Sequence, residues 1–186
     1  MKLAVFFPGI GYHTDKPLLY YSRKIAVELG YQTVEVKYGN FGAGIKGSRE
    51  KMEKAFVSAL AQAEEILEDI DFEDFEEILF VSKSVGTAVA SAYAEKRGLQ
   101  VRNIYYTPVE ASFSFMKQYG IVFHGTNDGW VDTEIVRTKC EEKGFPLYIT
   151  ENANHSLEMG ETLADLANMK EIMRITREYM KASDKA

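Results

Sequence analysis

The sequence is poor in the features that mark several classes of protein. Cys140 is the single cysteine in 186 residues, so no disulfide can form within the chain and clustered thiolate metal sites are excluded. No stretch approaches the roughly 18 apolar residues that a membrane-spanning helix needs. The first apolar run, residues 3–7, is too short for the core of a signal peptide and is predicted to be a strand. A cytoplasmic protein without membrane contact is expected.

Clustered positive charge is also scarce. The formal net charge is −6, and the Lys and Arg residues form no stripe. Phosphate binding needs clustered basic residues, so no nucleic acid partner is expected. No group of His, Cys and Asp has metal-ligand spacing, and neither a metal nor another cofactor is expected. No repeat, linker or low-complexity tract divides the chain, so residues 1–186 are predicted to form a single domain without a cap domain.

The sequence does contain six short apolar runs that alternate with longer segments of helical period. The runs lack an apolar–polar alternation, which is typical of strands covered on both faces. This pattern predicts an α/β fold, a three-layer α/β/α sandwich with a mainly parallel sheet of about six strands. The predicted strands are residues 3–7, 33–37, 78–81, 103–106, 120–123 and 147–150.

Helices are predicted between these strands, except around residues 109–117, where the connection is short and poorly specified. Ser48 is a plausible cap for the second helix, and Gly30, Gly98 and Gly144 stop the helices that precede them. The predicted apolar face of the first helix is Leu18, Tyr21, Ile25 and Leu29; of the second, Met52, Phe56, Leu60, Ala63 and Ile66; and of the last, Leu163, Leu166, Met169, Met173 and Met180.

The stretch LFVSKSVGTAVA places Ser84 where the third strand turns into an alanine-rich helix. Ligands of parallel sheets bind at the carboxyl ends of the strands, so Ser84 is on the functional edge. A serine in a sharp strand-to-helix turn exposes its hydroxyl and the next backbone N–H to one space. The turn requires small residues two positions away on both sides, here Ser82 and Gly86. Serine is also a favoured helix cap, and this motif alone leaves nucleophile and cap equally open.

Two further polar loops follow later strands at the same edge. HGTNDGWVD presents Asp128 after the fifth strand, and ENANHSLE presents His155 after the sixth. A serine hydroxyl becomes an effective nucleophile when an imidazole takes its proton and a carboxylate orients that imidazole. The three residue types are those that this chemistry needs, they follow one another in the order Ser, Asp, His, and each lies at the carboxyl end of a predicted strand. Ser84, Asp128 and His155 are therefore the predicted catalytic residues.

Other assignments remain open beside this one. Asp132 could supply the carboxylate, but it is better placed as the N-cap of the following helix. His124 ends a strand before a glycine, which favours a structural histidine over a base. Glu151 is a weaker candidate for a carboxylate behind the site, and His13 is a candidate lining residue in the first loop.

Ser82-Lys83-Ser84-Val85-Gly86 resembles G-x-S-x-G, the nucleophile elbow of the α/β-hydrolases, with serine in place of the first glycine. From Leu3 through the His155 loop the chain resembles their small, lidless branch, near dienelactone hydrolase and its esterase relatives. Dienelactone hydrolase carries cysteine where this chain has Ser84. The resemblance implies that the first two antiparallel strands of the family are missing. Residues 109–118, where the family inserts caps, are too few for one.

The resemblance also implies where a developing negative charge would be held. In the family, a loop after the first strand donates one N–H to the oxyanion, and the residue after the nucleophile donates another. Pro8-Gly9 stands at that loop's usual His-Gly position, which makes Ile10 and Val85 the implied donors. Gly11, Tyr12, His13 and Trp130 are candidate pocket residues. An open cleft is implied, with the candidate rim aromatics Tyr12, Phe113, Phe115 and Trp130.

Three other patterns have simpler interpretations. Residues 42–47 read G-x-G-x-x-G, but the next strand ends without an acidic residue to hold a ribose, so a flexible loop is favoured over a dinucleotide site. The carboxylates crowded between residues 64 and 77 are typical of a solvated helix end, with a partner-binding patch as the alternative. Cys140 has the helical spacing of a small core residue.

The sequence therefore predicts a serine hydrolase that cleaves a small ester or thioester through a Ser-His-Asp triad and an acyl-enzyme. Its expected partner is a small-molecule acyl substrate. Two alternatives remain: a catalytically silent binding protein with the same fold, and an acyltransferase that passes the acyl group to an acceptor other than water.

Overall fold

The computed structural model describes residues 1–42, 44–45 and 47–182. Six strands form one sheet in the order β2-β1-β3-β4-β5-β6, and every neighbouring pair is parallel. In chain order the elements are β1 (Lys2–Phe7), α1 (Pro17–Glu28), β2 (Gln32–Glu35), α2 (Arg49–Ile66), η1 (Phe72–Asp74), β3 (Glu77–Lys83), α3 (Val85–Arg97), β4 (Arg102–Tyr106), η2 (Glu110–Ser114), β5 (Gly120–Gly125), α4 (Thr133–Lys143), β6 (Leu147–Thr150) and α5 (Thr162–Lys181).

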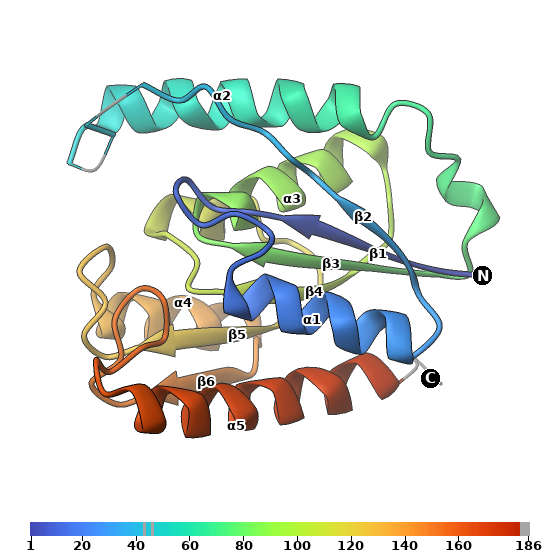
Figure 1. Ribbon diagram of the computed structural model, residues 1–186. Helices are drawn as coiled ribbons and strands as arrows, with labels where there is room; N and C mark the ends of the chain where they lie inside the picture. Colours follow the sequence, from blue (N-terminus) through green and yellow to red (C-terminus); the bar gives the residue numbers. More distant parts are fainter. Residues whose placement is uncertain (43, 46, 183–186) are drawn as a thin grey trace.

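Helices cover both faces of the sheet, with α1 and α5 on one side and α2, α3 and α4 on the other (Figure 1). Successive residues of β3 show why its run is continuously apolar. Leu79 and Val81 pack toward α1 and α5, whereas Phe80 packs toward α2 and α3. A strand that is covered by helices on both faces of the sheet has no solvent-facing side, so polar residues are not needed in it. The predicted three-layer α/β/α sandwich is confirmed, and the sheet is parallel throughout.

The strand positions agree with the prediction to within a few residues. β3 continues past residue 81 to Lys83, and β5 continues past residue 123 to Gly125, so His124 lies inside a strand. The poorly specified connection after β4 holds the short 3-10 helix η2. In the described residues no helix is both long and apolar enough to cross a bilayer.

Several predicted helix faces were wrong at particular residues. Leu163 and Leu166 at the start of α5 are 73% and 59% exposed, because α5 packs against α1 and the sheet through its later turns. Tyr21 is 46% exposed, since Ser22 faces inward and its hydroxyl bonds that of Tyr106 at 2.9 Å. The buried face of α2 consists of Ala55, Ala59 and Ala63, while Ile66 is 38% exposed.

Candidate active site

Ser84 stands in a sharp turn between β3 and α3. Its backbone has φ 55° and ψ −127°, a strained conformation for a residue with a side chain, and its N–H donates to the Tyr106 carbonyl at 3.0 Å. The turn brings α3 against the end of β1. A Cβ at Gly86 would lie 2.5 Å from the Phe7 carbonyl oxygen and closer still to that of Pro8. Only glycine fits at position 86.

Ser82 is the small residue on the other side of this turn, two positions before Ser84. Its side chain is fully buried, and its hydroxyl donates to the Ile104 carbonyl of β4 at 3.3 Å. The hydroxyl is therefore satisfied within the sheet, as a buried polar group needs to be. The turn accommodates this Cβ without displacing Ser84.

The Ser84 hydroxyl makes no capping hydrogen bond to α3. Instead Ser84 Oγ lies 2.8 Å from Nε2 of His155, and Nδ1 of the same imidazole lies 2.7 Å from Oδ2 of Asp128. An ionised carboxylate can only accept, so Nδ1 carries the imidazole proton and Nε2 accepts from the serine hydroxyl. The structure thus joins Ser84, His155 and Asp128 in one hydrogen-bonded chain, and the hydroxyl is oriented toward a proton acceptor.

Asp128 is held in one orientation by the loop after β5. Its side chain is fully buried, and Oδ1 accepts from the Trp130 amide at 2.8 Å while Oδ2 faces His155. Burial by itself would raise the pKa of this carboxyl. The hydrogen bonds from His155 and from the Trp130 amide outweigh burial and hold the pKa of Asp128 below its ordinary value. Asp128 is therefore a carboxylate at neutral pH.

The His155 loop is tied to its neighbours on two sides. The Thr107 hydroxyl, just past the end of β4, donates to the His155 carbonyl at 3.0 Å. The Asn127 amide of the Asp128 loop donates to the Ala153 carbonyl at 2.9 Å. The Trp130 ring stacks on the imidazole, with centroids 5.2 Å apart. These contacts fix the ring that lies between Ser84 and Asp128.

The electrostatic surroundings make His155 a base that is neutral at ordinary pH. Burial lowers the pKa of its imidazole, and the charge of Lys83 lowers it further, while Asp128 partly opposes both. The net pKa lies below the ordinary 6.5. An unprotonated imidazole can accept the serine proton, which is what a general base requires.

The loop after β1 forms a tight turn beside Ser84. Gly9 and Tyr12 close it with two backbone hydrogen bonds, of 3.1 and 3.2 Å, and Gly11 has the positive φ of 74° that favours glycine. A Cβ at Gly9 would lie 3.0 Å from the Cβ of Ser84, so the turn packs directly against Ser84. Among the described residues, neither the Ile10 nor the Val85 amide donates to any acceptor. Both implied donors therefore have an unused N–H.

The other candidate residues are distributed unevenly around this centre. Trp130 contacts His155, but Tyr12 is buried and its hydroxyl accepts from the Leu18 amide at 3.1 Å. Gly11 and His13 are exposed. Of the proposed rim aromatics, Phe113 is only 2% exposed, and Phe115 packs on Phe56 with centroids 5.1 Å apart. Phe113 belongs to the core beside α4 and does not form an edge of a cleft.

The alternative carboxylates have other positions. Asp132 accepts from the Glu134 amide at 2.8 Å as the N-cap of α4, as expected. Glu151 accepts from the Thr126 hydroxyl at 3.2 Å. The crowded carboxylates of residues 64–77 include one exception to the predicted solvated surface. Glu77 is half-buried and pairs with the buried Arg102, 2.7 Å away.

His124, for which the sequence favours a structural role, is a direct neighbour of the site. It is fully buried, its Nε2 lies 3.0 Å from the Thr133 hydroxyl, and its Nδ1 lies 3.8 Å from Asp128 Oδ2. Burial lowers the pKa of this imidazole. Lys83, Thr107 and His124 all fall at the carboxyl ends of strands, which is the one sequence signal that marks them.

The remaining sequence patterns are Cys140 and the G-x-G-x-x-G stretch. Cys140 is a buried residue of α4, and burial raises the pKa of its thiol to about 12. Positions 43 and 46 of the G-x-G-x-x-G stretch are outside the described residues. Within the described ranges, no group of three His, Cys, Asp or Glu side chains is arranged to hold a metal ion.

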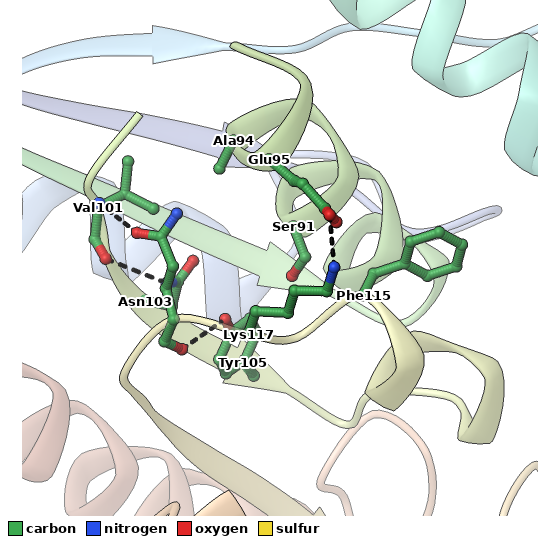
Figure 2. Close-up of a pocket in the computed structure, with 9 residues that line it drawn as sticks. Ser91, Ala94, Glu95, Val101, Asn103, Tyr105, Phe115 and Lys117 are labelled. Carbon is green, nitrogen blue, oxygen red and sulfur yellow. Dashed lines mark hydrogen bonds and ion pairs between the residues drawn. The ribbon is translucent and has the colours of Figure 1, made fainter. Parts of the chain in front are cut away.

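A cavity beside α3 and β4 is also separate from the triad (Figure 2). Ser91, Asn103 and Lys117 are among its lining residues, and Lys117 pairs there with Glu95. The Ser91 hydroxyl donates to the Thr87 carbonyl at 2.8 Å, so it is bound to the helix backbone. The cavity has neither an imidazole nor an activated hydroxyl among its lining residues.

Comparison with known proteins gives the fold a context. No family model and no curated protein matches the sequence. Among solved structures, a serine hydrolase homologue from Coxiella burnetii superposes with a TM-score of 0.69 at 16% identity, over 96% of this chain and 84% of the other. A lidless α/β serine hydrolase from Xanthomonas campestris gives 0.63 at 14% identity, over 98% and 84%.

A third structure, Est1E from Butyrivibrio proteoclasticus with ferulic acid bound, gives a TM-score of 0.70 at 12% identity, over 97% of this chain and 88% of the other. At these identities the likeness establishes the fold. The chain has the α/β-hydrolase fold, the architecture of serine hydrolases and esterases.

Proposed function

We propose that this protein is a serine hydrolase that cleaves a small ester or thioester by way of an acyl-enzyme. The observation that carries the proposal is the hydrogen-bonded chain from Ser84 through His155 to the buried Asp128. It supports proton transfer from hydroxyl to imidazole, which is the step that makes serine nucleophilic. The strained backbone of Ser84 supports it further, because strain of this kind collects at functional positions.

In the proposed reaction, Ser84 Oγ attacks the acyl carbonyl carbon and His155 Nε2 takes the hydroxyl proton. The carbonyl π electrons move to the oxygen, which becomes an oxyanion bound by the Ile10 and Val85 amides. One such donor stabilises the transition state by about 3 kcal/mol. When the bond to the leaving alkoxide or thiolate breaks, His155 returns the proton to it. Water, deprotonated by His155, then attacks the acyl-serine and releases the acid and the free hydroxyl.

Asp128 has a distinct role in this scheme. It keeps the proton on Nδ1, so that Nε2 is the acceptor, and it stabilises the imidazolium that forms in each half of the reaction. Lowering of its pKa by His155 and by the Trp130 amide supports a carboxylate that remains ionised throughout.

The test is active-site labelling of the purified protein with a fluorophosphonate, together with hydrolysis of short activated esters. Ser84→Ala is expected to fold, to resist labelling and to lower turnover by a factor on the order of 10⁴. Ser58→Ala, which removes an exposed hydroxyl on α2, is the matched control and is expected to label normally. Undiminished hydrolysis by Ser84→Ala would refute the proposal.

Two alternative functions give different results in the same assay. A folded wild-type protein that neither labels nor hydrolyses any acyl substrate would be a binding protein. A protein that releases acyl product only when an alcohol, thiol or amine acceptor is added would be an acyltransferase. The ester panel includes hydroxycinnamoyl esters, since ferulic acid is bound in the Butyrivibrio protein of the same fold.

A further inference from the structure

Lys83 is the residue immediately before Ser84 and the last residue of β3. By the alternation of the strand, Ser82 faces α3 and Lys83 faces the opposite side of the sheet, where Tyr12 belongs to the core between α1 and α5. The Lys83 side chain is only 1% exposed. A lysine is among the residues least often buried to this extent, so its presence here needs a physical reason.

The ammonium of Lys83 has an aromatic ring as its neighbour in place of a carboxylate. Among the described residues, no acceptor or acid bonds it, and its Nζ lies 4.9 Å from the centroid of Tyr12. That distance is within the range of a cation–π interaction. Burial lowers the pKa of Lys83 to about 7, with the charge of Asp128 opposing the shift. A titratable amine thus occupies a buried position where Leu or Val would pack.

Tyr12 connects this lysine to the proposed oxyanion site. Its backbone closes the Gly9–Tyr12 turn that carries the Ile10 amide, and its hydroxyl accepts from the Leu18 amide at the start of α1. The turn also touches Lys83 directly, since a Cβ at Gly9 would lie 3.6 Å from Lys83 Cγ. The Lys83 side chain is therefore adjacent to the Gly9–Tyr12 turn, and Lys83 itself immediately precedes the nucleophile.

We propose that Lys83 is a positioning residue of the serine site: its buried side chain, held on the face of Tyr12, fixes the Gly9–Tyr12 turn against the nucleophile and, in its protonated form, supplies a positive charge near His155. The inference rests on the proposed hydrolase function and adds a residue to it. Lys83 acts through the Ile10 amide and through the basicity of His155, without contact to substrate.

The second part of this role is electrostatic. Lys83 is one of the groups that lower the pKa of His155, so its charge keeps the base neutral at lower pH. Among the described residues, the other titratable groups that act on Lys83 and His155 are Asp128 and His124, both from the β5 side. Tyr12, whose ring meets Lys83, is in turn influenced by Glu158 and Tyr106. Asp128 attracts protons to both groups, whereas Lys83 and His124 repel them from His155.

Lys83→Met tests the inference, because methionine has a similar length and no charge. We expect kcat for a short activated ester to fall by roughly 10- to 100-fold with KM little changed, since a misplacement of about 1 Å can lower the rate on the order of 10²-fold. The acid limb of kcat/KM should move to higher pH, because removing a nearby cation raises the pKa of His155. The melting temperature should stay equal or rise, since a buried charge is gone.

Loss of activity without loss of stability separates this role from simple packing, for which both would fall together. Lys16→Met is the matched control. Lys16 is exposed and its Nζ lies 5.9 Å from the same ring, so its removal should leave kcat and the acid limb unchanged. Tyr12→Leu is the second variant: it removes the ring but keeps the charge, and is expected to lower kcat while the acid limb stays in place.

The inference is overturned if folded Lys83→Met retains wild-type kcat and an unmoved acid limb. If Lys83→Met does not fold, an undiminished kcat for folded Tyr12→Leu overturns it instead. Failure of the hydrolase proposal looks different, because then the wild-type protein and the Lys16→Met control would also fail to label with a fluorophosphonate.

Discussion

His155 Nε2 lies 2.8 Å from Ser84 Oγ, although 71 residues separate the two in the chain. The sheet accounts for this meeting, because β3, β4 and β5 are parallel neighbours whose carboxyl ends share one edge. Backbone contacts complete it: the Thr126 amide donates to the Thr150 carbonyl at 3.1 Å, tying the loop after β5 to the end of β6. The short distance between Ser84 Oγ and His155 Nε2, which suits proton transfer, is thus set by the strands and loops along this edge of the sheet together.

Asp128→Asn is expected to leave the fold intact and to lower kcat by a factor on the order of 10⁴. An amide NH₂ facing Nδ1 favours the imidazole tautomer with its proton on Nε2, which cannot accept from Ser84. The measurement is ester hydrolysis with thermal melting as the check on folding.

Glu151→Gln is the matched control for that experiment. It removes a carboxylate from the adjacent loop that bonds Thr126 and makes no contact with His155, so activity should be retained. A loss of less than tenfold in Asp128→Asn, or an equal loss in both variants, would contradict the orienting role of Asp128.

The fold was predictable because its signals are local. Apolar runs mark strands that are covered on both faces, and glycines mark the ends of the helices between them, so the number of strands and their positions along the chain could be inferred from spacing. Helix faces were less predictable. Leu163 and Leu166 fit the helical period of α5 but lie before the turns that meet the core, and period alone does not say where a helix meets its partner.

The candidate site was predictable to the extent that chemistry and chain order constrain it. Ser84, Asp128 and His155 were singled out by residue type and by the strand end that each follows, and the structure has them in contact. Their catalytic roles remain predictions. Lys83 and His124 share only the strand-end position, and their residue types do not complete the set. That each is buried beside the triad depends on side-chain directions that only tertiary packing sets.

Substitutions of the two small residues around Ser84 should differ in their effect on activity. Gly86→Ala is expected to destabilise the protein and abolish labelling, because its Cβ would overlap the backbone at the end of β1, which cannot move aside. Ser82→Gly restores the residue common in the elbow motif. It should stay active and lose about 1 kcal/mol of stability, from backbone entropy and from the hydrogen bond to Ile104.

Urea unfolding and fluorophosphonate labelling of both variants measure these effects. Full labelling of a stable Gly86→Ala protein would show that the turn is looser than the structure describes. Inactive but folded Ser82→Gly would show instead that the serine itself is needed at the elbow.

At the opposite edge of the sheet, Glu77 makes a contribution to stability that is separate from the site. It pairs with Arg102 at 2.7 Å and with Lys2 at 2.9 Å, and it accepts from the Tyr31 hydroxyl. Burial favours the neutral acid, but these partners outweigh it and lower the pKa of Glu77 below its ordinary 4.5. Its folded-state pKa is depressed, so the stabilisation is present above about pH 4.5 and is lost as the pH falls through the folded-state value.

Glu77→Gln should therefore lower the free energy of unfolding at pH 7 by about 3 kcal/mol, because it leaves the buried Arg102 guanidinium without its carboxylate. The difference from wild type should shrink on acidification below pH 4, while labelling of Ser84 at neutral pH stays unchanged. Glu76→Gln is the neighbouring control: its carboxylate is 91% exposed, and its loss should change stability by no more than about 0.5 kcal/mol. Equal destabilisation by the two variants, at every pH, would mean that burial of the Glu77–Arg102 pair has no energetic consequence.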